Sequence, residues 1–232
     1  MPATVKVVLG KSLREANETW AGRVRDKLRT LGTLAVNLMG SPGCGKTTLL
    51  CATLQRLRGL APAMPLYVVE GDPYTTRDAE AVGAQGVPVV QINTRGGCHL
   101  DARMVDEALR HLDLKPRGTL FIENIGNLIC PGGFDLGEDL RVALLSAPEG
   151  NDKPEKYAAM FRRCDAVVLS KMDLCGPTGF DPGLAREAVR RLNPAAAVFS
   201  LSARDGTGMG PWTEWLMDRA AAKRSTADPG GV

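Results

Sequence analysis

Short runs of apolar, often β-branched residues alternate with helical patterns along most of the chain. Seven of these runs are predicted to be strands, at residues 33–39, 66–70, 87–92, 119–123, 142–147, 166–170 and 197–201. Strands that alternate with helices in this way form a mostly parallel sheet with helices on both faces. Because the crossovers are right-handed, the carboxyl ends of the strands share one edge, where ligands bind. The pattern therefore predicts an α/β fold whose functional residues follow strands.

A helical pattern also precedes the first strand. Ser12 and Glu15 have the spacing of a capping box. The apolar positions that follow are typical of one helix face: Leu13, Ala16, Trp20, Val24, Leu28 and Leu31. We expect an amphipathic helix packed on the sheet domain, so that residues 1–32 form an N-terminal extension.

The end of the chain has a different composition. Residues 222–232 are small, polar and rich in Gly and Pro, and they follow a helical pattern that contains Trp212, Trp215 and Leu216. We expect them to be a flexible tail. Because no linker interrupts the pattern before this tail, residues 33–221 are predicted to be one domain.

Composition excludes some classes of partner. The chain is 44% hydrophobic and 24% charged, with a formal net charge of +3, and its basic residues alternate with acidic ones. Without a basic stripe, nucleic acid is not expected as a partner. The N-terminus lacks an apolar signal region and no segment is long enough to cross a bilayer, so we expect no membrane and a cytoplasmic location. The six cysteines are then expected to be reduced thiols.

A phosphate loop follows the first predicted strand. Residues 40–48 (GSPGCGKTT) match the pattern of glycines followed by Lys and Thr, and an apolar helical segment comes next. In such a loop the backbone and helix N-terminus wrap the phosphates, Lys46 reaches the β and γ phosphates, and Thr47 binds Mg²⁺. The predicted nucleotide ligands are Gly43, Cys44, Gly45, Lys46, Thr47 and Thr48. The fold class is therefore a P-loop NTPase with a seven-stranded sheet.

The base is predicted from the segment after the sixth strand. Residues 170–173 (SKMD) resemble the Asn-Lys-x-Asp element of GTPases, in which the Asp binds the guanine edge and the Lys stem stacks on the ring. Asp173 and Lys171 match this element, and Ser170 replaces the Asn that holds the phosphate loop in GTPases. We therefore expect guanine selectivity in a loosened site. Ser202 and Ala203 resemble the next guanine-contacting loop.

Two carboxylates are predicted to serve magnesium and water. Glu123 ends a predicted strand where many GTPases have Asp-x-x-Gly, and Asp78 follows Gly71-Asp72. Thr75 or Thr76 could instead cap a helix, and Asp78 would then be a charged residue in the first turn of that helix. This interpretation of Asp78 is compatible with a role at magnesium. With Lys46, these carboxylates are the predicted catalytic residues.

A second set of residues has the chemistry of a transition-metal site. Cys98 and His99 follow the third strand, and Cys130 lies seven residues beyond Glu123. Two thiols and an imidazole suit nickel or zinc. A nearby helix N-terminus is expected to favour the Cys98 thiolate.

These motifs together resemble the HypB family, the GTPases of nickel incorporation in hydrogenase maturation. The matching segments are Asn37-Leu38-Met39, Gly71-Asp72, Asp78-Ala79, residues 98–102 (CHLDA), 123–131 (ENIGNLICP) and 149–154 (EGNDKP). The resemblance runs from about Leu13 to Leu216. It implies a Ni²⁺ or Zn²⁺ site of Cys98, His99 and Cys130, and magnesium at Thr47 and Asp78.

The resemblance also implies partners. These are a GTP-dependent homodimer that shares the metal site, the helper proteins of hydrogenase maturation and the hydrogenase large subunit, with Lys153 reaching the partner's nucleotide. Some family members carry a Cys-rich or His-rich nickel motif near the N-terminus. The first 40 residues contain neither Cys nor His, so we expect only the nucleotide-coupled site.

Three alternatives remain open at this point. The urease accessory GTPase UreG is a sister, but its metal motif resembles Cys-Pro-His and fits Cys98-His99 poorly. A non-catalytic metal-binding module would use nucleotide only to hold its fold. A P-loop small-molecule kinase would need an acceptor-binding lid or an Arg-rich segment, and neither is evident.

Overall fold

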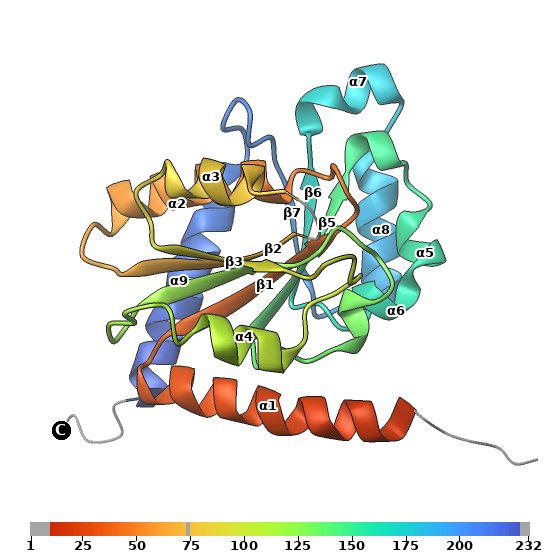
Figure 1. Ribbon diagram of the computed structural model, residues 1–232. Coiled ribbons are helices and arrows are strands. Elements are labelled where there is room, and N and C mark those ends of the chain that lie inside the picture. Colours follow the sequence, from red (N-terminus) through yellow and green to blue (C-terminus); the bar gives the residue numbers. More distant parts are fainter. Residues whose placement is uncertain (1–9, 73–74, 228–232) are drawn as a thin grey trace, which may run out of the picture.

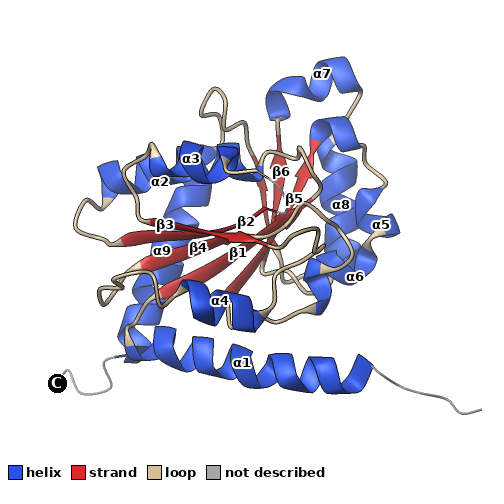
Figure 2. Ribbon diagram, in the orientation of Figure 1, coloured by secondary structure: helices blue, strands red, loops and turns tan. Residues whose placement is uncertain are grey.

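A computed structural model describes residues 10–72 and 75–227. In this part of the chain, seven strands form one all-parallel sheet in the order β3-β2-β4-β1-β5-β6-β7 (Figures 1 and 2). They are β1 (Leu34–Gly40), β2 (Leu66–Asp72), β3 (Val89–Asn93), β4 (Thr119–Glu123), β5 (Leu140–Ser146), β6 (Ala166–Ser170) and β7 (Ala197–Ser200). The predicted strands and fold class are confirmed.

Helices cover both faces of this sheet (Figure 2). They are α1 (Gly10–Thr30), α2 (Lys46–Leu60), α3 (Arg77–Gly83), α4 (Ala102–Ala108), α5 (Lys153–Lys156), α6 (Ala158–Phe161), α7 (Cys175–Thr178), α8 (Pro182–Leu192) and α9 (Met209–Ala227). The 3-10 helices are η1 (Pro131–Gly133), η2 (Ala147–Glu149) and η3 (Met172–Leu174).

The central strand β1 is buried along its whole length, which explains its continuous apolar sequence. Leu34, Val36 and Leu38 pack in the core under α2 and α9. Ala35 and Met39 belong to the cores on the opposite face, under α1 and α4 and under α6 and α8 respectively. The carboxyl end of β1 therefore emerges between two layers of helices, at the edge where the phosphate loop begins.

The helix α1 is present, but its buried face differs from the predicted stripe. Among its described side chains, Asn17, Ala21, Val24 and Leu28 are buried. Ala16 is exposed, and the half-exposed Trp20 lies under the guanidinium of Arg23. Val24 and Leu28 were predicted, whereas Asn17 and Ala21 were not, because a polar residue begins the buried face. The helix also begins at Gly10, before the predicted cap at Ser12, and the side chain of Leu13 lies outside the described ones.

The predicted tail begins too early. Helix α9 continues to Ala227, and the Lys223 ammonium pairs with the Asp139 carboxylate. Residues 222–227 are thus ordered by helix formation and by this half-buried ion pair. The remaining residues 228–232 lie outside the described part, as do residues 1–9. Across the described helices, none has the length and apolar character required to cross a lipid bilayer.

One glycine determines how α1 docks. Gly137 has a φ of +83°, and a Cβ there would lie 2.6 Å from the Ala21 carbonyl oxygen. We expect Gly137→Ala to lower the free energy of unfolding by at least about 1–2 kcal/mol, because left-handed backbone and a steric clash act together. Urea denaturation measures this change. Gly133→Ala is the control, since its Cβ would meet nothing within 4 Å, and an equal effect of both substitutions would contradict the assignment.

Candidate functional site

The phosphate loop connects β1 to α2. Gly43 and Gly45 have φ values of +74° and +96°, which only glycine adopts without strain. The Cys44 side chain is buried, and its Sγ lies 2.6 Å from where a Gly40 Cβ would be, so the loop offers the Cys44 backbone to ligand. The Lys46 ammonium lies within 3.5 Å of the Gly40 and Ser41 carbonyl oxygens. A cavity of about 440 Å³ opens in front of this loop.

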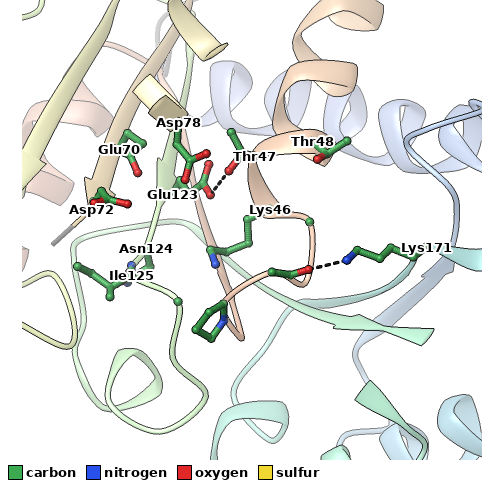
Figure 3. Close-up of a pocket in the computed structure, with 15 residues that line it drawn as sticks. Lys46, Thr47, Thr48, Glu70, Asp72, Asp78, Glu123, Asn124, Ile125 and Lys171 are labelled. Atoms are coloured by element: carbon green, nitrogen blue, oxygen red, sulfur yellow. Dashed lines mark hydrogen bonds between the residues drawn. The ribbon is translucent and has the colours of Figure 1, made fainter. Parts of the chain in front are cut away.

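Carboxylates from three segments line the same cavity (Figure 3). The Thr47 hydroxyl donates a hydrogen bond of 2.8 Å to Glu123. Carboxylate oxygens of Glu70, Asp72 and Asp78 lie within 4.8 Å of one another. Glu70 is placed here because β2 pairs with β4 in a register that sets it beside Glu123.

The motifs did not single out Glu70, whose only sequence signal is its position at a strand end before Gly71-Asp72. Asp78 lies in the first turn of α3 and also lines the cavity, so both interpretations of this residue agree with its position. Thr76 precedes the helix but makes no side-chain cap to its backbone; its hydroxyl donates to Glu80 instead.

Burial shifts the pKa values of two of these carboxyl groups, those of Glu70 and Glu123. It raises the pKa of Glu70 to about 8, with a further contribution from Glu123. Burial also raises the pKa of Glu123 to about 7, against the lowering effect of Lys46. One oxygen of each carboxylate is buried without a hydrogen-bond partner. Oxygen donors that lack partners fit a hard divalent cation such as Mg²⁺.

A second cavity, of about 310 Å³, lies on the other side of the phosphate loop. Lys171, Asp173 and Ala203 line it, as the GTPase-like elements predict, together with Thr48 and Arg204. Ser202 is buried instead, and its backbone amide donates to Thr207 within the loop. Ser202 therefore shapes the loop behind Ala203.

Two hydrogen bonds hold the strand end of β6 to the phosphate loop. The Ser170 hydroxyl donates to the Cys44 carbonyl oxygen at 2.7 Å, and the Lys171 ammonium donates to that of Gly43 at 2.6 Å. Ser170 thus makes the kind of contact attributed to the Asn that it replaces. Arg204 lies 4.0 Å from the Asp173 carboxylate, at the mouth of the cavity.

The structure brings Cys98, His99 and Cys130 together, with ligand atoms within 4.8 Å of one another. Cys98 Sγ lies 3.4 Å from His99 Nδ1, and the imidazole stacks on the Phe134 ring at 3.9 Å between centroids. Cys98 and His99 lie between β3 and α4, whereas Cys130 and Phe134 follow β4. Two soft sulfurs and an imidazole fit nickel or zinc.

The expected Cys98 thiolate is not supported. A hydrogen bond with Cys130 and desolvation raise the pKa of Cys98, and α4 begins only at Ala102, where Asp101 caps it. The helix N-terminus is thus already satisfied by a carboxylate. Burial lowers the pKa of His99, which favours the neutral imidazole that binds metals.

The loop between β4 and Cys130 contacts both sites. A Cβ on Gly126 would lie 2.9 Å from the Pro42 backbone. The backbone N–H of Asn127 donates to the Gly40 carbonyl oxygen at 2.9 Å. The Asn127 side chain donates to the Cys98 carbonyl oxygen at 3.3 Å. One short loop therefore connects the phosphate loop to the metal cluster. Lys153, at the start of α5, lies with its ammonium 5.5 Å from the Tyr157 ring.

A parallel sheet with this phosphate loop and a Lys-x-Asp base loop defines a P-loop GTPase. A model of the CobW/HypB/UreG nucleotide-binding domain matches residues 34–200. The hydrogenase maturation factor HypB of Azotobacter vinelandii is 47% identical over 90% of this chain and 66% of its own length. That of Escherichia coli (strain K12) is 44% identical over 90% of this chain and 71% of its own length.

A solved structure agrees with these comparisons. The crystal structure of HypB from Helicobacter pylori in complex with nickel matches with a TM-score of 0.84 and 34% identity, covering 90% of this chain and 97% of that one. The chain belongs to the CobW/HypB/UreG family, and within it to the HypB proteins. It spans about two thirds of the length of the two HypB relatives compared by sequence.

The base cavity gives a first prediction for nucleotide choice. Asp173→Asn should weaken GTP binding at least about tenfold and improve xanthine-nucleotide binding, because a charge-assisted pair with guanine contributes on the order of 1.5–3 kcal/mol. Titration with labelled GTP, XTP and ATP measures this. Asp205→Asn, on the neighbouring exposed loop, is the control. Equal affinity of the parent protein for ATP and GTP would refute the assignment.

The buried carboxylates predict a pH dependence of stability. Their pKa values are raised above the ordinary 4.5, so the stability they contribute is present below that pH and is lost as pH rises through about 7 and 8. Without nucleotide and magnesium, the free energy of unfolding should fall across this window. Glu70→Gln and Glu123→Gln should each flatten the slope, whereas Glu18→Gln on the exposed face of α1 should not. A parent-like slope in both variants would contradict the prediction.

Proposed function

We propose that this protein binds and hydrolyses GTP in the cytoplasm and uses the nucleotide state to control nickel delivery during maturation of [NiFe]-hydrogenase. The observation that carries the proposal is the contact of the loop 124–130 with both the phosphate loop and the Cys98-His99-Cys130 cluster. Family membership supports the hydrogenase role.

The nucleotide roles follow from the two cavities. Lys46 lies where it can neutralise the β and γ phosphates, and Lys171 and Asp173 flank the base cavity. The other proposed ligands are the phosphate-loop residues Gly43, Cys44, Gly45, Thr47 and Thr48 and the base-loop residue Ala203, with Ser202 shaping the loop behind it. A bound GTP would thus extend across the phosphate loop from one cavity to the other.

Magnesium fits the carboxylate side of the cavity. Thr47, Asp78 and Glu123 would hold it directly or through water, and a bound Mg²⁺ supplies charge neutralisation at the phosphate oxygens. Asp78 and Glu123 would also orient a water near the γ phosphate. Glu70 adds a fourth carboxyl group to this wall of the cavity.

Nickel is the proposed cargo, and zinc suits the same ligands. Cysteine binds metal as the thiolate, so metal binding at Cys98 and Cys130 would release protons and affinity would depend on pH. Three ligands from one chain leave coordination positions open for a partner or an acceptor. Such an incomplete site suits transfer of a metal better than storage.

A homodimer would place two of these clusters face to face. Ile129, next to Cys130, is 71% exposed and would lie at the contact between the two copies in such a dimer. The proposed partners are a second copy of this chain in the GTP state, the maturation helper proteins and the hydrogenase large subunit. Lys153 is proposed to reach the second copy's nucleotide. Magnesium-dependent release of phosphate from GTP would distinguish this enzyme from a module that binds nucleotide without hydrolysis.

We expect the nucleotide state to change metal affinity, because the γ phosphate and Cys130 act on opposite ends of one loop. Coupling of this kind corresponds to roughly a several-fold to hundredfold difference in nickel affinity between the GTP-analogue and GDP states. Chelator competition and sedimentation measure affinity and mass in each state. Lys46→Ala should abolish the difference, and identical affinities and monomer fractions in both states would exclude coupling.

The same chelator competition tests the three proposed metal ligands. Cys98→Ala, His99→Ala and Cys130→Ala should each weaken nickel binding while GTP affinity stays nearly unchanged. Cys51→Ala is the matched control, because Cys51 is half-buried on α2 with its thiol near the Ala81 carbonyl oxygen. If Cys130→Ala bound nickel like the parent, the site would have to lie elsewhere.

A further inference from the structure

Helix α1 lies outside the segment that the family model matches, yet it touches both chain segments that carry the metal cluster. It packs along α4, and Figure 1 shows the two helices as successive layers beside the sheet. The first segment, residues 98–102, runs from Cys98 into α4. The second, residues 130–137, contains Cys130 and the Phe134 ring that stacks on His99.

A single carboxamide of α1 connects these segments. Asn17 Oδ1 accepts a hydrogen bond of 2.9 Å from the Ala102 amide, and Asn17 Nδ2 donates one of 2.7 Å to the Asp135 carbonyl oxygen. Asn17 is only 9% exposed. Both ends of the Asn17 amide are therefore hydrogen-bonded. Ala102 lies three residues after His99, and Asp135 follows Phe134, the residue that stacks on His99.

The second segment is fixed on α1 by further contacts. The Arg25 guanidinium pairs with the Asp135 carboxylate at 2.7 Å, and the Gly137 backbone packs directly against Ala21. The exposed ion pair contributes little on its own. The buried Asn17 contacts contribute more, because breaking them leaves two backbone groups and a side-chain amide buried without hydrogen-bond partners.

The first segment is held from its other side by Asn124, whose Oδ1 accepts a hydrogen bond of 3.2 Å from the Leu100 amide. Residues 98–102 are thus hydrogen-bonded by three carboxamides, those of Asn124 and Asn127 from the GTPase domain and that of Asn17 from α1. Of these three described carboxamides, that of Asn17 is the one that also bonds residues 130–137. Both nucleotide cavities are lined by other elements.

We propose that Asn17 is a positioning residue of the metal site. It sets the separation of the Cys98-His99 segment from the Cys130-Phe134 segment, and thereby the fit of the three ligands to one ion. Groups that orient metal ligands without touching the metal typically change affinity about 10- to 100-fold when removed. The inference rests on the proposed function, because it requires that the cluster binds metal.

The test compares Ni²⁺ affinity of the full chain and four variants by chelator competition, with GTP-analogue affinity in parallel. Asn17→Leu removes both hydrogen bonds and should weaken nickel binding roughly 10- to 100-fold without changing nucleotide affinity. Asn17→Asp keeps the acceptor for Ala102 but loses the donor to Asp135, so it should show a smaller loss. The thiolate-to-nickel absorption band should also shift in Asn17→Leu, since the ligands no longer converge.

The matched control is Asn193→Leu. The Asn193 side-chain amide donates to the carbonyl oxygens of Phe161 and Cys164, so its loss costs stability without removing a hydrogen bond to either metal segment. It should leave nickel affinity and the absorption band unchanged. Equal losses in Asn17→Leu and Asn193→Leu would overturn the proposal, because general destabilisation would then explain both.

Cys130→Ala separates this inference from the proposed function. If Cys130→Ala loses nickel while both Asn17 variants bind like the parent, the positioning role is wrong and the metal site stands. If Cys130→Ala binds nickel like the parent, the proposed metal site itself is wrong, and with it this inference. Should Asn17→Leu not fold, Asn17→Asp decides the question: parent-like affinity and absorption overturn the role, and weakened binding supports it.

Discussion

The close approach of the loop after β4 to the phosphate loop is the contact on which the rest of the site depends. Gly126 allows it, since any Cβ would collide with Pro42, and the Asn127 amide fixes it through the Gly40 carbonyl oxygen. The same loop carries Glu123 at its start and Cys130 at its end. The phosphate loop and a residue of the Cys98-His99-Cys130 cluster are therefore joined through one short segment of chain.

The nucleotide side of the site contains two buried carboxyl groups that impose a second constraint. Glu70 and Glu123 lie on neighbouring parallel strands at the same level, and burial keeps both partly protonated near neutral pH. A magnesium ion with phosphates would replace the missing solvent around them, so ligand binding and ionisation assist each other. The raised pKa values of Glu70 and Glu123 therefore have the same origin, which is burial of a carboxyl group at the carboxyl end of the sheet.

Much of this architecture could be predicted from the sequence, because buried parallel strands give continuous apolar runs and the shared sheet edge collects the loops that follow them. The proximity of Cys98, His99 and Cys130 was predicted on that basis. Glu70 was missed because its environment comes from the pairing of β2 with β4, which no local pattern encodes. Asn17 was missed for a related reason: its partners lie 85 and 118 residues away in sequence, and a polar residue breaks the apolar stripe that defines a helix face.

The distribution of thiols has a practical consequence for chemical labelling. Burial raises the pKa of Cys44 to about 11 and that of Cys164 to about 12, so neither is reactive towards alkylating reagents at neutral pH. Cys98 is exposed and Cys130 half-exposed on the same face. Cys51 and Cys175 are half-exposed as well. A bound ion would shield Cys98 and Cys130 from a maleimide dye and leave Cys51 and Cys175 to react as before. The rate of labelling becomes an optical signal of metal occupancy that needs no engineered cysteine.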